Sequence, residues 1–205
     1  SGLELRCLAH YLAKYDDGEY ANEIVNGDIH THNQKSAGLD TRDKAKTFIY
    51  AFLYNAGDRR IASITGKTVK EAKELREKFL NNTPAIRRLR NDVLNAVEIR
   101  GYLRGIDGRR LAIRQAPLNT LIQSAGALIV KQATILLHKI IRKEKLDCSM
   151  VAHIHDEMQL QCKEDITEYV GQQAVQSIRA TKDFFDFRCE LDGEFKIGKT
   201  WADTH

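Results

Sequence analysis

The sequence predicts an α+β fold, in which an antiparallel sheet is combined with many helices. Most of the chain carries apolar residues at the spacing of amphipathic helices. The other segments are typical of hairpins, because short apolar stretches flank turn residues and no βαβ unit recurs. Hydrophobic residues make up 42% of the 205 positions, so the chain can bury a core of useful size.

The chain opens with a helical pattern, because its apolar residues fall at Leu5, Leu8, Ala9 and Leu12. Residues 16–41 are polar and rich in turn residues, and no regular element is predicted there. We therefore expect one helix followed by a long irregular segment.

A second helix is predicted to begin at residue 42, with Thr41 or Asp40 as its N-terminal cap. It should end near 55–57, where asparagine and glycine occur. The same periodicity predicts further helices over residues 68–80, 84–99, 117–145 and 165–181.

Strands are predicted where the helical period is lost. Asp107-Gly108 between two short apolar segments is a strong hairpin signal. Residues 150–163 are typical of a strand, a tight turn and a returning strand, and residues 187–201 are expected to return to the sheet. The predicted strands therefore pair as hairpins.

The net charge of +4 is distributed unevenly. Residues 42–114 carry 18 basic and 8 acidic side chains, whereas the flanking parts are mildly acidic. A basic middle segment suggests a surface that faces an anionic polymer. A solvated helix with alternating charges would explain the stretch 67–78 equally well. Arg87 and Arg88 are expected to lie on a solvated face.

Cysteine usage and hydropathy indicate a reduced, intracellular setting. Cys7, Cys148, Cys162 and Cys189 are scattered and form no CxxC pair, so buried thiols are favoured over a disulfide frame or a zinc site. No signal peptide is visible, and no apolar stretch is expected to span a membrane. We expect a cytoplasmic location and no membrane partner.

One candidate site lies on the predicted helix after Thr41. Arg42, Lys46, Tyr50 and Tyr54 are four residues apart and so share one face of that helix. Two cations followed by two aromatic rings make a plausible platform for a nucleotide, with phosphates on the cations and the sugar and base on the rings. The alternative is a basic helix face whose tyrosines pack on the core.

A second candidate is the triplet His155-Asp156-Glu157 in a predicted hairpin turn. Adjacent acids on a strand point to opposite sides, so one can bind a metal while the other faces elsewhere. An exposed turn acid is the plain alternative. A third interpretation is a hydrolase metal site, because His153 and His155 alternate on one strand face.

The order and wording of several segments resemble family A DNA polymerases, in the phage replicative branch. SGLELRCLAH resembles the end of motif A, and RDKAKTFIYAFLYNAG resembles motif B in the fingers. LNTLIQSAGALIVK is similar to the helix that follows the fingers, and VAHIHDEMQLQC is similar to motif C. GDIHTHNQ and GKTWADTH also match, so the resemblance covers essentially the whole chain.

The resemblance implies a role for each matched residue. Asp156 corresponds to a catalytic carboxylate that binds metal, with His155 before it and Glu157 beside the primer end. Lys46, as a catalytic cation, should grip the triphosphate of the incoming nucleotide together with Arg42 and His30.

Further matched residues would contact the sugar, the bases and the template. Tyr50 should lie against the sugar and base, and tyrosine rather than phenylalanine here governs tolerance of nucleotides that lack a 3′-hydroxyl. Glu4 takes the sugar-side position, and Tyr54 should stack at the templating position. Asn119 and Gln123 should touch the minor-groove side of the new pair. Asn55 stands where the family usually has glycine, and its effect on Tyr54 stays open.

The resemblance also implies cofactors and partners. Two Mg²⁺ ions, primer-template DNA and deoxynucleoside triphosphates are expected. The motif A aspartate would lie upstream of Ser1, so we expect this chain to be a C-terminal portion that needs an upstream polymerase fragment and is at best weakly active alone.

The implied organisation is an antiparallel palm sheet with helices and a helical fingers subdomain. Palm is expected over residues 1–39 and 101–205, with fingers over 40–100. Two other interpretations stay open beside a DNA-directed DNA polymerase. One is a non-catalytic DNA- or nucleotide-binding remnant, or one half of a split polymerase. The other is the hydrolase, against which the matched motifs argue.

Overall fold

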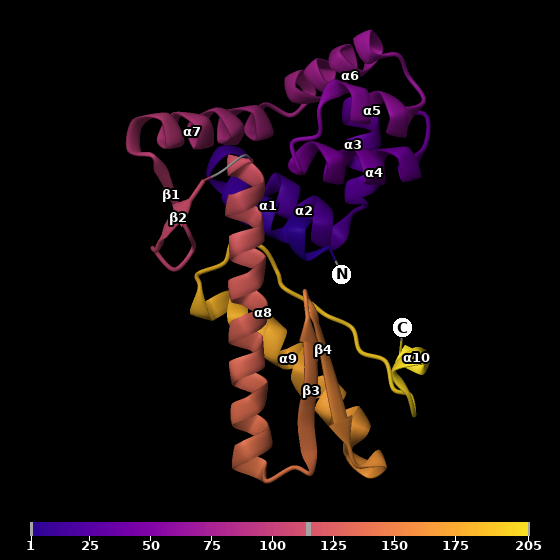
Figure 1. Cartoon of the computed structure of the whole chain (residues 1–205), viewed down its shortest axis with the longest axis vertical. Coiled ribbons are helices and arrows are strands. Elements are labelled where there is room, and N and C mark those ends of the chain that lie inside the picture. The colour runs from indigo at the N-terminus through magenta and orange to yellow at the C-terminus, as the bar shows by residue number, and fades with distance from the viewer. Residues whose placement is uncertain (1, 114–115, 205) are drawn as a thin grey trace.

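Most of the chain is helical in the computed structural model, which describes residues 2–113 and 116–204 (Figure 1). Ser1 and His205, the outer limits of the predicted palm segments, lie outside the described residues. The first helices are α1 (Leu3–Asp16), α2 (Glu19–Asn26), α3 (Ile29–Ala37), α4 (Arg42–Leu53), α5 (Asp58–Thr65), α6 (Val69–Asn82) and α7 (Pro84–Arg100). The remaining elements are β1 (Tyr102–Arg104), β2 (Arg110–Ala112), α8 (Pro117–Glu144), β3 (Cys148–Ile154), β4 (Glu157–Cys162), η1 (Glu164–Ile166), α9 (Thr167–Phe184) and α10 (Trp201–Thr204).

The predicted helices are confirmed within a few residues, and their termini follow from local sequence. Thr41, not Asp40, caps α4 by accepting a hydrogen bond from the backbone N–H of Lys44 at 3.2 Å. Thr68 and Glu71 form a capping box at the start of α6. Pro117 opens α8, where its missing N–H has no intrahelical partner to lose.

Some expectations for the first part of the chain were wrong. Residues 16–41 are not a loop but hold α2 and α3, because Asp28 caps α3 with its side chain and Ile29, Asn33 and Ala37 bury one face of that helix. The short helix α5 was also missed. Arg87 keeps 38% of its side chain exposed and bonds Glu77 and Asn81 at the surface, which agrees with the expected solvated face.

The C-terminal segment does not return to a sheet. Side chains attach it to α9 instead of backbone pairing, since Arg179 bonds Asp192 at 2.9 Å and Lys182 bonds Glu190. A Cβ at Gly171 would collide with the ring of Phe195, so this glycine allows the close approach. Two separate antiparallel hairpins, β1–β2 and β3–β4, therefore make up the sheet structure of the described residues.

Helix α8 forms the centre of the molecule and contacts α1, α7 and α9 (Figure 1). It is long and apolar enough to cross a membrane, which corrects the expectation that no stretch reaches this length. Its apolar residues meet neighbours on several sides, and a core helix passes the same test of length and composition. One such helix is weak evidence for a membrane span.

The helices α3–α6 form a group at one end of the molecule, and the hairpin β3–β4 lies at the other side of α1 (Figure 1). Phe48, Phe52 and Phe79 form the aromatic centre of this group, with ring centroids 5.2 to 6.1 Å apart. Because α3 packs on α4 and α6, the group begins before residue 40. The palm and fingers boundaries themselves stay a prediction.

Candidate active site

The tip of the β3–β4 hairpin presents a carboxylate. Ile154 pairs with Glu157, so His155 and Asp156 are the two loop residues. His155 has φ 55°, a conformation that favours glycine, so the loop is held in a strained form. Asp156 is exposed, and both acids line a cavity of about 460 Å³ between the hairpin, α9 and residues 192–198.

Three side chains from distant parts of the chain meet beside α1. The hydroxyl of Tyr54 donates a hydrogen bond to Glu4 Oε1 at 2.6 Å, and Gln123 Nε2 donates to Tyr54 Oη at 3.1 Å and also to Glu4. The hydrogen bond to Glu4 raises the pKa of Tyr54 to about 12. This cluster joins α1, the end of α4 and the first turns of α8.

Asn55 resolves the one departure from the motif B pattern. Its φ is 57°, the left-handed conformation that glycine adopts without strain and asparagine tolerates best among the other residues. It follows Tyr54, the C-terminal cap of α4. The backbone is therefore one that glycine would adopt readily, and Tyr54 leaves the helix at this point.

Tyr50 connects the cluster with the hairpin tip. Its ring is half-buried on the core. Burial raises the pKa of its phenol first, and the charges of Glu4 and Asp156 raise it further. Two carboxylates that are more than 150 residues apart in the sequence therefore act on the pKa of one phenol.

Arg42 does not project freely from α4. Its Nε and Nη2 donate to the carboxylate of Asp28 at 2.8 and 3.1 Å. This hydrogen-bonded pair lowers the pKa of Asp28 below its usual range. Asp28 also accepts hydrogen bonds from the backbone N–H groups of His30 and Thr31, so one carboxylate fixes both the start of α3 and the guanidinium.

Asp28 was missed as a site residue in the sequence. The available signal was its position as an N-cap directly before Ile29 and close to the platform helix. Its hydrogen bond with Arg42 joins the start of α3 to the start of α4, and a local sequence pattern cannot predict a contact between two helices.

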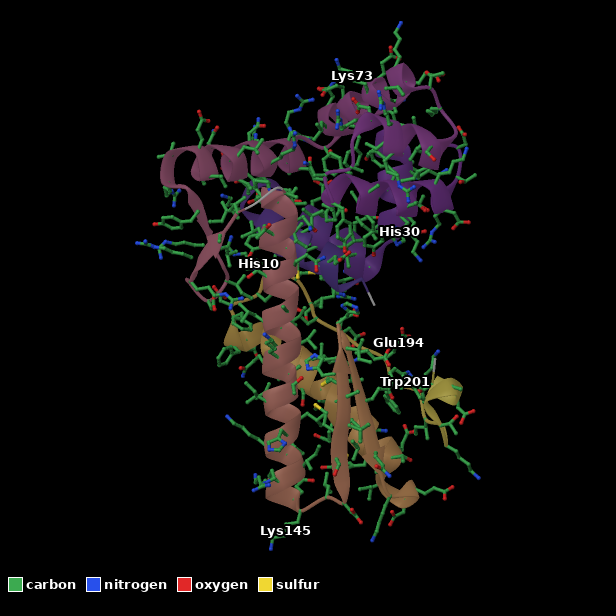
Figure 2. All side chains as sticks on the ribbon, viewed as in Figure 1. His10, His30, Lys73, Lys145, Glu194 and Trp201 are labelled. Atoms are coloured by element: carbon green, nitrogen blue, oxygen red, sulfur yellow. The ribbon has the colours of Figure 1, made fainter. Side chains whose placement is uncertain are left out.

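His30 lies close to the basic face of α4, at the lower edge of the α3–α6 group in Figure 2. Burial lowers its pKa, and the nearby charges of Arg42 and Lys46 lower it further. Its Nδ1 is buried and has no hydrogen-bond partner among the described residues. Lys46 is exposed and pairs with no carboxylate in the described part of the chain. These groups can therefore accept an anionic ligand.

Asn119 lies apart from the cluster around Gln123. It lines a cavity of about 150 Å³ with Asn55, Arg76 and Arg90. One turn of α8 thus separates the two residues that were predicted to touch the same base pair. The sequence placed both on the correct helix, but only Gln123 contacts Glu4 and Tyr54.

The carboxylate of Asp156 at the β3–β4 tip could supply one protein ligand of a cation site. Across residues 2–113 and 116–204, no three His, Cys, Asp or Glu side chains gather as a metal-binding group. This gives no support to a hydrolase site built on His153 and His155. Asp156 offers the hard oxygen ligands that Mg²⁺ prefers, and Mg²⁺ commonly needs only one or two protein carboxylates when substrate phosphates and water complete its shell.

Comparison with known proteins gives one consistent result. Residues 1–203 match the model of DNA polymerase family A. The DNA-directed DNA polymerase of Escherichia phage T7 is 46% identical over 228 residues, which cover 100% of this chain and 32% of the phage protein. DNA polymerase I of Geobacillus stearothermophilus is 27% identical and is covered to 25%. The chain thus spans about a third or less of the length of these relatives.

A solved structure agrees in fold. The polymerase domain of Pol1 from M. smegmatis, in complex with DNA primer-template and dNTP, matches with a TM-score of 0.79 at 22% identity. The match covers 94% of this chain and 37% of that domain chain. The fold, the order of the motifs and the family match agree, and the chain belongs to DNA polymerase family A.

Proposed function

We propose that this chain provides the nucleotide-binding and catalytic part of a DNA-directed DNA polymerase, which adds deoxynucleotides to a primer 3′-end. The observation that carries the proposal is the hydrogen-bonded cluster of Glu4, Tyr54 and Gln123, which brings α1, the end of α4 and α8 together. Beside them, cations of α4 and His30 form a basic face. A carboxylate site next to a phosphate site is what phosphoryl transfer requires.

The basic face would hold the triphosphate. Lys46 offers a mobile charge, and Arg42 offers a planar fork that Asp28 already orients. His30 would donate a hydrogen bond to a phosphate oxygen. These groups would neutralise the charge that develops on the departing pyrophosphate, which lowers the barrier because the donors are fixed in advance.

Asp156 would hold Mg²⁺, with a second ion shared by the reacting phosphates. When bound, two such ions stabilise the attacking and leaving oxygens of the transfer. Glu157 would lie beside the primer end, and His155 holds the strained turn that presents Asp156. The upstream part of the polymerase is the expected source of further carboxylate ligands and is the expected partner.

The cluster around Glu4 would face the new base pair. Glu4 would exclude a ribose 2′-hydroxyl, and Gln123 would read the minor-groove acceptors that every correct pair presents. Tyr54 would occupy the templating position, from which it must leave Glu4 when the template base enters. Asn119, one turn earlier on α8, would contact the same groove.

Primer extension tests this function. The chain is assayed alone and as a chimera in which it replaces the matched third of the phage T7 polymerase. We expect template-dependent extension by the chimera and at most very weak extension by the chain alone. A folded chimera that binds primer-template DNA but adds no nucleotide would contradict the proposal and favour a non-catalytic DNA-binding role.

Lys46→Ala is expected to raise the nucleotide concentration required by the chimera and to slow the chemical step. The lysine has no carboxylate partner among the described residues, so its charge is available to phosphates. Lys73→Ala is the matched control, because Lys73 is exposed on α6 and projects away from the site in Figure 2. Steady-state kinetics with varied nucleotide measure both variants, and equal defects would contradict the assignment.

A further inference from the structure

The β1–β2 hairpin carries two arginines directly opposite each other. Arg104 pairs with Arg110 in the register of the two strands. Like charges at opposed positions of an antiparallel pair destabilise it. Neither guanidinium forms an ion pair within the described part of the chain, since the single acid of the loop, Asp107, lies 3.5 Å from Arg109. An anion from outside the hairpin would reduce the repulsion between the two guanidinium groups.

The fold keeps these two charges on the outer face. Leu103 and Leu111, which alternate with the arginines, are 5% and 8% exposed and anchor the other face in the core. Tyr102 lies on the outer face as well, and the guanidinium carbons of Arg104 and Arg110 are 5.9 and 4.7 Å from its ring centre. The ring attracts both cations, and Arg104 also donates a hydrogen bond to the Gly108 carbonyl at 3.1 Å, so part of the side-chain freedom is already lost before a phosphate binds.

The hairpin is also fixed relative to the candidate active site. Arg109, between the loop and β2, donates a hydrogen bond to Ser124 Oγ at 3.3 Å. Ser124 is the neighbour of Gln123, which contacts Glu4 and Tyr54. The outward arginines therefore lie beside α8, at its end nearer α7 (Figure 1).

We propose that Arg104 and Arg110 bind the sugar–phosphate backbone of the primer-template DNA next to the nascent base pair. This inference rests on the proposed function. Guanidinium groups recognise phosphate by paired N–H donors, and exposed phosphate contacts fix the register of a duplex without reading its sequence. The two arginines position DNA and do not touch the reacting atoms.

The test is DNA binding by the 205-residue chain itself. Fluorescence anisotropy with labelled primer-template DNA is measured at several concentrations between about 50 and 200 mM salt. In the double variant Arg104→Gln/Arg110→Gln we expect about tenfold weaker binding and a salt dependence, the slope of log K against log[salt], reduced by about 1.8, since each lost phosphate contact removes about 0.9. Circular dichroism confirms that the variant is folded.

Lys139→Gln/Lys143→Gln is the control, with the same change of charge. Both lysines are exposed near the far end of α8, which Lys145 marks in Figure 2. In this control variant the slope of log K against log[salt] should equal that of the parent chain. An unchanged slope in the arginine variant, an equal loss in the control, or no DNA binding by the parent chain would overturn the proposal.

Two further measurements distinguish DNA binding by these arginines from nucleotide binding and from the proposed polymerase function. Binding of a deoxynucleoside triphosphate without DNA should be equal in the parent chain and the arginine variant, and a loss there would assign the arginines to the nucleotide instead. Primer extension by the chimera reports on the polymerase function independently. A chimera without activity, combined with the expected loss of salt dependence, would leave the hairpin assignment standing and contradict the proposed function alone.

Discussion

Asp156→Asn is expected to lower the turnover of the chimera at least a hundredfold, which corresponds to about 2.7 kcal/mol in the barrier. Asparagine keeps the size of the side chain but removes the charge that would hold Mg²⁺. DNA affinity should change little, because cation–phosphate contacts elsewhere supply most of it. Single-turnover extension and anisotropy measure the two quantities separately.

The control for this substitution lies on the same hairpin. Asp147→Asn changes an exposed acid at the base of the hairpin, where it lies 3.5 Å from Lys163. This variant should keep the turnover of the parent. If Asp156→Asn retained more than about a tenth of the parent turnover, a difference under roughly 1.4 kcal/mol, Asp156 would not be a metal ligand.

Tyr50→Phe is expected to make the polymerase reject dideoxynucleotides. A normal nucleotide fills the small polar gap at its sugar with its own 3′-hydroxyl, which can bond its own phosphate. When that hydroxyl is missing, the phenol of Tyr50 can supply the lost hydrogen bond and phenylalanine cannot. An unpaired buried acceptor costs about 1–3 kcal/mol, so the discrimination should rise tenfold or more.

The measured quantity is the ratio of incorporation efficiencies for dideoxy and deoxy substrates. Tyr50→Phe should change this ratio and leave normal nucleotides nearly unaffected, whereas Tyr169→Phe should change neither. Tyr169 loses the same hydroxyl on α9, where it bonds Glu144 at 2.7 Å. A ratio that stays constant in the Tyr50 variant would mean that the phenol does not face the sugar.

Local signals in the sequence predicted most elements well. A cap at Thr41 or Asp40 and a tight turn at His155 each depend on neighbouring residues, and the Thr41 cap and the turn are present in the structure. The helices α2 and α3 were missed because they are short, at 8 and 9 residues, and their few buried positions do not fill a long periodic window. The strand predicted over residues 187–201 was wrong because side-chain contacts with α9, and not backbone pairing, hold this segment.

The candidate site was predicted one residue at a time but not as a set of contacts. Helical spacing placed Arg42, Lys46 and Tyr50 on one face of α4, as observed. The bond between Tyr54 and Glu4, and the grip of Asp28 on Arg42, join separate helices and depend on tertiary packing. A sequence pattern reports residues within one element, so contacts of this kind could not be predicted.

Helix α1 forms hydrogen bonds with residues that are very distant in the sequence, whereas the α3–α6 group does not depend on such contacts. Arg6 and His10 bond Glu190 and Arg188, which are 184 and 178 positions away, whereas α3 to α6 pack on near neighbours. Closing a longer loop costs more chain entropy, and non-local contacts slow folding. The α3–α6 group should therefore assemble early. Helix α1, although it precedes that group in the sequence, must wait for residues 188–190 before these contacts are complete.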